Sequence, residues 1–442
     1  MHVSALKIAN VKTFCDGQVN LTFTRPDGSL PKWIVVAGRN GAGKTTLLQA
    51  VALSIVGPSM GRVLTETFAG WIRSGELTAT VATKLEFSDE DTFAQGRRPL
   101  FSPWTALRWT SQPSGPEPLL EREITGGSWT PGRGPWSENP RGWFLAGYGP
   151  FRRLSPAPTD AQRMMMSTGR QASLVSLFRE EASLSESILW LQQIYLRRLE
   201  NKPGAETTEA IVLALLGDGL LPEGMKVLRV DSEGLWVSTA TNTELPLRSL
   251  SDGYRTVAAL VLDLVKQLVD NLGELHVDSN NEALQVLNEG VVLIDELDVH
   301  LHVSWQQQIG FWLKSHFPNL QFIVTTHSPF ICQAADEGGL IRLPPPGSDE
   351  VASVVEGEMF NRIVNGSADD AVLSDFFGLE TSYSSRSAGL RKELSELEAG
   401  GQQTHLSAAE KERLNSIRDQ LPQTPSGDVA RALSGLANLL DK

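Results

Sequence analysis

Residues 38–45 carry the clearest chemical signal in the sequence. Their order, Gly38-Arg39-Asn40-Gly41-Ala42-Gly43-Lys44-Thr45, matches G-x-x-x-x-G-K-[ST] at every fixed position. Glycines allow successive backbone N–H groups to surround a phosphate, a lysine adds positive charge, and a threonine hydroxyl can ligate Mg²⁺. We expect this loop and Thr46 to bind ATP, and we expect Thr45 to ligate the metal. The alternative, a turn that binds nothing, is weak because the whole pattern is present.

Two adjacent carboxylates end a later apolar run. Asp295 and Glu296 directly follow Val291-Val292-Leu293-Ile294, and Mg²⁺ prefers few carboxylates together with water and phosphate oxygens. We therefore expect Asp295 to hold Mg²⁺ and Glu296 to orient or deprotonate the attacking water. A solvated Asp-Glu turn is the alternative, and the complete phosphate loop makes it a poor one.

A histidine ends another apolar run. His327 follows residues 321–326, which read as a buried strand. Ligands of open α/β sheets bind beyond the carboxyl ends of the strands. We expect His327 to hydrogen-bond the γ-phosphate and to respond to its hydrolysis. A purely structural histidine is the alternative.

A third polar cluster, Ser251-Asp252-Gly253, precedes a long apolar helix expected over Thr256–Val269. A serine hydroxyl, free backbone N–H groups and the helix dipole together favour an anion at this end. Ser251 or Asp252 would also serve as a helix N-cap, and both roles can hold at once.

The surrounding pattern predicts the elements that position these residues. Trp33–Ala37 reads as the strand before the phosphate loop, and the helix after it is expected to end at Gly57-Pro58. Residues 155–217 have helical periodicity, whereas 90–142 read as short strands and loops. Further strands are expected at 3–9, 19–23, 77–87, 143–148, 227–230 and 234–238.

The fold class indicated is α/β, with a helical C-terminal part. Residues 359–442 look mostly helical and charged, and Leu390, Leu394 and Leu397 either pack in a helical hairpin or dock a partner. We divide the chain into 1–154, a lobe with the phosphate loop and antiparallel strands; 155–248, a helical insertion with a hairpin; 249–345, a second ATPase lobe; and 346–442, the helical extension.

Composition limits the possible partners and locations. The chain has 442 residues, enough for two or three domains, and a net charge of −13, so a nucleic acid would need a local basic patch. Its two cysteines, Cys15 and Cys332, suggest neither a disulfide framework nor a zinc site. We see no signal peptide and no apolar run of about 20 residues. We expect a cytoplasmic protein with no membrane partner.

The order of these motifs resembles that of the ABC-type ATPases. Residues 6–14 are similar to the first strand of the RecF, SMC and OLD branch, and residues 148–152 also resemble that branch. Residues 298–306 resemble the hLHP-x-x-Q stretch of OLD-like ATPases, with Val303 at the proline position. The tail at 369–380 resembles the end of stand-alone AAA-family ATPases found beside phage-defence nucleases, such as the Septu ATPase.

The resemblance implies an ABC-ATPase head, with a mixed sheet carrying the phosphate loop, an antiparallel β-subdomain and a helical lobe. It also implies a head-to-tail homodimer in which Ser251 and Gly253 of one copy cap the γ-phosphate held by Lys44 of the other. The sequence departs from the family in two further places. No glutamine stands at the Q-loop, whose place residues 148–152 take, and nothing supplies the acidic cluster of the OLD Toprim nuclease.

The leading hypothesis is an ATP-driven switch or motor for a DNA-directed process, with anti-phage defence beside a partner nuclease as its setting. A RecF-like repair clamp is the alternative, with DNA contacted by arginines of the helical lobe. These candidates are Arg152, Arg153, Arg163, Arg170, Arg179, Arg197 and Arg198. A transporter nucleotide-binding subunit and an ATP-binding scaffold without turnover fit the sequence less well.

Overall fold

The computed structural model divides the chain into two compact units, Met1–Ala371 and Val372–Lys442. It describes residues 1–421 apart from 95–97, 125–129, 139, 151–163, 165–168, 181–183, 222–223, 279–282, 380 and 404–405. The four-part division expected from the sequence remains a prediction.

A six-stranded sheet forms the centre of the first unit. Across the sheet the strands are β16 (Ser353–Val354), β15 (Leu340–Arg342), β3 (Trp33–Ala37), β14 (Leu320–Thr326), β13 (Gly290–Ile294) and β7 (Leu145–Tyr148). All neighbours are parallel except β15 and β16. Because parallel strands end at the same edge, the residues after β3, β13 and β14 meet there. The phosphate loop, Asp295 and His327 are these residues.

A five-stranded antiparallel sheet forms the second layer. Its order is β2 (Val19–Thr22), β1 (His2–Ala9), β4 (Thr78–Glu86), β5 (Trp104–Gln112) and β6 (Gly115–Arg122). Along β4 half-buried and buried residues alternate, as expected for a sheet with one covered face.

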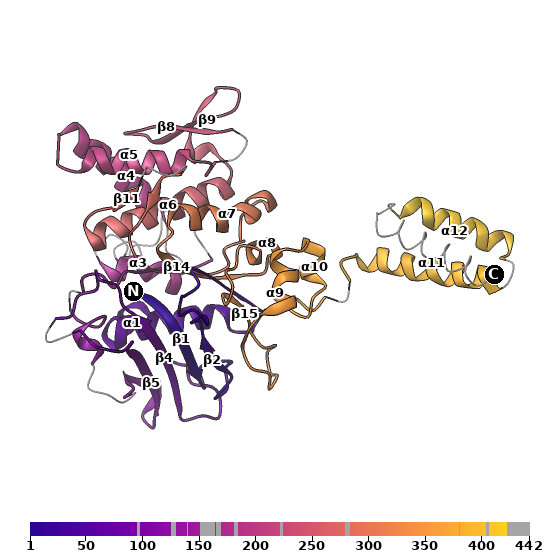
Figure 1. Ribbon diagram of the computed structural model, residues 1–442, viewed down its shortest axis with the longest axis horizontal. Helices are drawn as coiled ribbons and strands as arrows, with labels where there is room; N and C mark the ends of the chain where they lie inside the picture. Colours follow the sequence, from indigo (N-terminus) through magenta and orange to yellow (C-terminus); the bar gives the residue numbers. More distant parts are fainter. Residues whose placement is uncertain are drawn as a thin grey trace. The chain divides into compact units, whose positions relative to one another are not determined.

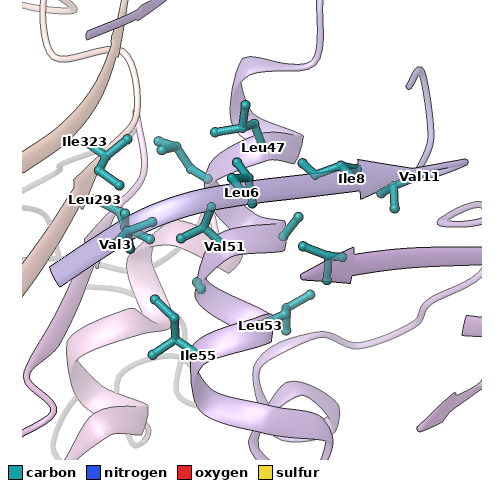
Figure 2. Packing of buried hydrophobic residues seen from close by; sticks show 14 of the residues in the cluster. Val3, Leu6, Ile8, Val11, Leu47, Val51, Leu53, Ile55, Leu293 and Ile323 are labelled. Carbon is teal, nitrogen blue, oxygen red and sulfur yellow. The ribbon is translucent and has the colours of Figure 1, made fainter. Parts of the chain in front are cut away.

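Helix α1 (Lys44–Leu64) forms one core with both sheets. Figure 2 shows Leu47 and Val51 of α1 among residues of β1, with Leu293 and Ile323 of the central sheet close by. Each of these side chains is at most 2% exposed, and burying one stabilises the fold by about 1.5–3 kcal/mol. This packing fixes the start of α1, and with it the phosphate loop, against the end of β3.

The helix predicted to end at Gly57-Pro58 does leave helical geometry at Gly57, but a second helical segment follows directly. The helix bends at Gly57, whose φ is 86°, and continues to Leu64. Pro58 is accommodated because it begins the second segment, where its missing N–H has no partner to lose. By length and composition alone this helix could cross a membrane, but 67% of its apolar 18-residue window is buried inside the protein.

A helical lobe with two small sheets stands beside the central sheet. Figure 1 shows α4–α6 gathered with β8 and β9. The helices are α3 (Arg170–Phe178), α4 (Ser185–Leu199), α5 (Ala205–Gly217), α6 (Asp252–Leu272) and α7 (Val303–His316). The strands are β8 (Lys226–Asp231), β9 (Gly234–Ser238), β10 (Glu244–Pro246), β11 (Val277–Asp278) and β12 (Gln285–Val286). The hairpin expected at 227–238 is therefore present.

The described residues of the C-terminal part are mostly helical, as expected, and residues 422–442 of that prediction lie outside the described residues. The short helices α8 (Pro329–Cys332), α9 (Gly357–Val364) and α10 (Ala368–Val372) precede α11 (Ser385–Gln403) and α12 (Ala408–Gln420). The last two form a hairpin held by ion pairs of Arg413 with Glu393 and of Arg418 with Glu398. The structure thus has the predicted fold class, a mixed sheet with a phosphate loop, an antiparallel sheet, a helical lobe and a helical extension.

Candidate functional site

The phosphate loop joins β3 to α1 in a conformation that requires its glycines. Gly41 and Gly43 have φ values of 80° and 91°, and the Ala42 amide donates to the Arg39 carbonyl at 3.1 Å. A Cβ on Gly43 would lie 2.6 Å from the ring of Phe14. The loop therefore tolerates no side chain at Gly43, and Phe14 fixes its underside.

The loop presents a polar rim to solvent. Arg39, Asn40, Gly41 and Thr45 are exposed, whereas the next residue, Thr46, is 9% exposed. Ala42 is buried, and Gly38 is half-buried, with its Cβ position 3.0 Å from that of Leu343. Some of the residues expected to bind the cofactor are therefore accessible to solvent, and the others are packed against the rest of the protein.

Lys44 and His327 meet at the centre of the site. Lys44 Nζ lies 2.8 Å from His327 Nε2 and donates to the Gly38 carbonyl at 3.1 Å. Burial lowers the pKa of Lys44, and the carboxylates of Glu296, Asp295 and Asp298 oppose that shift. Burial and the neighbouring lysine also lower the pKa of His327, which favours its neutral form. A neutral imidazole beside an ammonium group can contact a phosphate without adding a second positive charge.

Thr45 and Asp295, the two residues expected to hold the metal, are hydrogen-bonded to each other. Thr45 Oγ1 donates to Asp295 Oδ2 at 2.6 Å, and Thr325 Oγ1 donates to Asp295 Oδ1 at 2.5 Å. Asp295 is completely buried. A hydroxyl and one carboxylate are oxygen donors of the kind Mg²⁺ uses when phosphates and waters supply the rest. Among the described residues there is no cluster of three or more acidic, histidine or cysteine ligands, so the donors fit Mg²⁺ better than a metal caged entirely by protein.

Glu296 occupies a strained backbone position. Its φ is 45°, in the left-handed region that few non-glycine residues adopt, and its amide donates to Thr325 Oγ1 at 2.7 Å. Asp298, two residues on, accepts from Thr326 Oγ1 and from the His327 amide at 3.2 Å. The backbone after β13 is thus held to the end of β14, which sets the direction of the Glu296 side chain.

Ser251 and Gly253 line a pocket at the start of α6. The pocket has a volume of about 380 Å³ and is also lined by Tyr254, His300, Leu301, His302 and Trp305. Ser251 has the N-cap backbone conformation of α6, but its side chain makes no capping hydrogen bond. Asp252 pairs with Arg255 instead. No phosphate-loop residue is among the described residues that line this pocket.

Glycine is required at position 253 because the turn after Asp295 and Glu296 packs closely against it. A Cβ at this position would lie 2.6 Å from the His300 carbonyl oxygen. His300 itself has a φ of 69°. The start of α6 therefore packs closely against residues 298–302, so a movement of one segment would displace the other.

The sequence patterns did not indicate that Thr325, Asp298 and Phe14 belong to the site. Thr325 and Asp298 stand next to expected site residues, so their hydrogen-bonding side chains at strand ends were the available signal. Val303, the departure from the family pattern, is the first residue of α7, where proline is common because its N–H needs no partner. His302 caps that helix by accepting from Ser304, so the helix begins normally without a proline.

Two family models match the chain. "AAA domain" matches residues 5–110, and "AAA domain, putative AbiEii toxin, Type IV TA system" matches residues 193–333. The first segment contains the phosphate loop, and the second contains Ser251, Asp295 and His327. Both halves of the site described above therefore lie in matched segments.

The similar proteins include a Septu protein, a retron ATPase and an Smc head. Septu protein PtuA of Bacillus mycoides (strain KBAB4) is 25% identical over 357 residues, which cover 80% of this chain and 41% of that protein. The retron Ec83 probable ATPase of Escherichia coli is 42% identical over 95 residues, 22% of this chain and 16% of that protein. An Smc head bound to the C-winged helix domain of ScpA has a TM-score of 0.47 at 17% identity, covering 80% of this chain and 98% of that one.

The chain spans 41% and 16% of the lengths of the two curated relatives. The similarity therefore covers only part of each of these longer proteins. The matched segments contain the phosphate loop, the buried carboxylate beside Thr45 and the histidine beside Lys44. Two segments of the chain are therefore similar to AAA domains, and over part of its length the chain resembles Septu protein PtuA and a retron ATPase.

Proposed function

We propose that the chain hydrolyses ATP with Mg²⁺ at a site completed by a second copy, and that this cycle is the switch of an anti-phage defence system. The observation that carries the proposal is that the described residues lining the Ser251 pocket include none of the phosphate loop. Lys44 and His327 gather at one place, while Ser251 and Gly253 line a different pocket. A head-to-tail pair would bring the Ser251 half of one copy over the Lys44 half of the other.

Each residue has a chemical task in this scheme. Lys44 and the loop amides bind the β- and γ-phosphates, and His327 contacts the γ-phosphate as a neutral donor. Thr45 and Asp295 would hold Mg²⁺, which supplies Lewis-acid stabilisation of the charge that develops on the phosphate. Glu296 orients the attacking water and accepts its proton. The hydroxyl of Ser251 and the N-terminus of α6, from the second copy, would bind the γ-phosphate from its other side.

The partner and the setting are proposed from the relatives. Septu and retron proteins are among the similar proteins, and we propose a nuclease effector whose DNA-directed activity the ATPase controls in the cytoplasm. Closing two heads on ATP and releasing them after hydrolysis would give the effector two states to distinguish.

The arginines expected to contact DNA give no support to the repair-clamp alternative. Arg170 donates to the carbonyls of Pro135 and Trp143, Arg179 pairs with Glu66, and Arg198 pairs with Glu209. Arg197 is exposed, and Arg152, Arg153 and Arg163 lie outside the described residues. Three of the four described arginines are thus already engaged within the protein.

Mixing two inactive variants tests whether the site is shared between copies. Lys44→Ala removes the phosphate-binding ammonium, and Ser251→Ala removes the hydroxyl offered to the other copy. We expect each variant alone to release no phosphate from ATP, because two copies of the same variant cannot form an intact site. A mixture contains dimers with one intact site, so we expect about a quarter of the wild-type rate when copies exchange freely.

Two controls make this result decisive. Lys44→Ala mixed with Lys44→Ala,Ser251→Ala contains no intact site and should stay inactive. Mass photometry of differently tagged copies confirms that the variants exchange. Full exchange without recovery of phosphate release would contradict a shared site.

A further inference from the structure

A small polar cluster lies in the interior between the helical lobe and the central sheet. Tyr148, the last residue of β7, is 1% exposed, and Asp263 and Gln267 on α6 are 2% and 1% exposed. Asp263 is the ionisable group that acts on the Tyr148 hydroxyl. The cluster therefore joins a strand of the central sheet to the helix that begins beside Ser251.

The cluster is incompletely satisfied in this structure. Gln267 Nε2 reaches the two oxygens of Asp263 only at 3.4 and 3.5 Å. Tyr148 Oη and Gln267 Oε1 are buried without a hydrogen-bond partner of regular geometry. Leaving such atoms unpaired is costly in a protein interior, and well-packed cores avoid it. A small shift of α6 relative to β7 would change the contact between Asp263 and the Tyr148 hydroxyl, whereas Asp263 and Gln267 would keep their separation because both lie on α6.

Burial and charge make Asp263 sensitive to such a shift. Burial raises the pKa of Asp263 to about 6, while Lys266, Tyr148 and Gln267 oppose that rise. Burial beside Asp263 also raises the pKa of Tyr148 well above its usual value. Among the described residues, the titratable groups that act on Asp263 are Tyr148 of β7 and Lys266 and Asp270 of α6 itself.

Tyr148 is directly connected to Asp295. Its carbonyl accepts the Asp295 amide at 2.8 Å, and Tyr148 lies opposite Ile294 in the β7–β13 register. At the other end of the connection, Asp263 lies eleven residues after Asp252, about 16 Å along a continuous helix. A helix of this length moves as a rigid body, so its start and Asp263 shift together.

We propose that Tyr148 and Asp263 are positioning residues that couple the start of α6, with Ser251, to the metal-binding end of β13. In the closed dimer, the second copy's nucleotide draws the start of α6, and the Tyr148–Asp263 contact tightens. The backbone of Tyr148 then fixes Asp295 in its metal-binding position. This inference rests on the shared site proposed above, and it adds the route by which one site responds to the other.

The test compares dimer formation in a background that retains ATP. Glu296→Gln alone is the reference, and Tyr148→Phe, Asp263→Asn and the double variant are added to it. Tyr195→Phe, a half-buried tyrosine of α4, is the matched control. Mass photometry with Mg²⁺ and ATP gives the dimer dissociation constant, fluorescent ATP gives the affinity of the monomer, and thermal melts confirm folding.

We expect Tyr148→Phe and Asp263→Asn each to weaken the ATP-dependent dimer about 5- to 10-fold, with monomer affinity for ATP nearly unchanged. The double variant should be no weaker than either single one, because the two residues act through one contact. Acidification through pH 6 protonates Asp263, so it should weaken the reference dimer more than the Asp263→Asn dimer. Tyr195→Phe should match the reference.

Folded variants that form dimers with the affinity and pH profile of the reference would overturn the inference. So would additive losses in the double variant, since these would mean independent structural effects. A reference protein that does not dimerise with ATP would be a different failure, because it would refute the shared site itself.

Discussion

At the scale of single residues, Thr325 connects the two carboxylates of the site. Its buried hydroxyl donates to Asp295 and accepts from the Glu296 amide. Replacing it by isosteric valine leaves a buried carboxylate oxygen and a buried amide without this partner, at a cost of about 1–3 kcal/mol. We therefore expect Thr325→Val to slow phosphate release roughly 10- to 100-fold, while ATP affinity, which depends on Lys44 and the loop, changes little.

The control for this variant is another buried threonine. Thr83 is fully buried in β4 and hydrogen-bonds Ser54, within the antiparallel sheet and α1. Thr83→Val should therefore cost stability without a selective loss of turnover. A Thr325→Val enzyme with the wild-type turnover number would show that this hydroxyl has no part in positioning the carboxylates.

Residue types at strand ends predicted much of the candidate site. The structure brings Lys44, Thr45, Asp295 and His327 together as expected, although their catalytic roles stay predictions. Thr325 and Asp298 were not recognised, because threonine and aspartate at strand ends are common and only the register of β13 against β14 aligns them with Thr45 and Asp295. That register is a long-range property that no local pattern contains.

At the scale of elements, the bend in α1 is held by one glycine. Gly57 has a φ of 86°, and a Cβ there would lie 2.7 Å from the ring of Trp136. Gly57→Ala adds left-handed strain and crowds that ring, so we expect it to lower the free energy of unfolding by about 2–4 kcal/mol. Chemical denaturation monitored by tryptophan fluorescence would measure this change.

Gly217→Ala is the matched control, because Gly217 ends α5 with nothing within 4 Å of its Cβ position. We expect it to change stability by less than about 0.5 kcal/mol. Equal stability of the Gly57→Ala variant and the wild-type protein would mean that the bend relaxes without cost.

The strands were easier to predict than the end of α1. Buried runs such as 291–294 and alternating stretches such as 77–87 have few other structures available. A Gly-Pro pair usually ends a helix, but here Trp136, about 80 residues later in the chain, fills the bend and the helix resumes. The end of α1 is therefore decided by tertiary packing rather than by the local sequence.

At the scale of the whole molecule, the account depends on a second copy. Lys44 contacts His327, and the described lining of the Ser251 pocket includes neither residue; the sequence suggested a site shared between copies only through a family resemblance. Local sequence patterns predict structure within one chain, whereas the surface that contacts another copy is made of residues from many elements. For the same reason, the sequence does not identify the effector partner.

The most direct test of the central claim is the mass of the Glu296→Gln protein in solution, measured by light scattering with and without Mg²⁺ and ATP. Removing the general base should leave ATP bound between the copies, so we predict a monomer without nucleotide and a dimer with it. Lys44→Ala in the same background should stay monomeric under both conditions. A Glu296→Gln protein that binds ATP but keeps one mass throughout would contradict the ATP-dependent shared site.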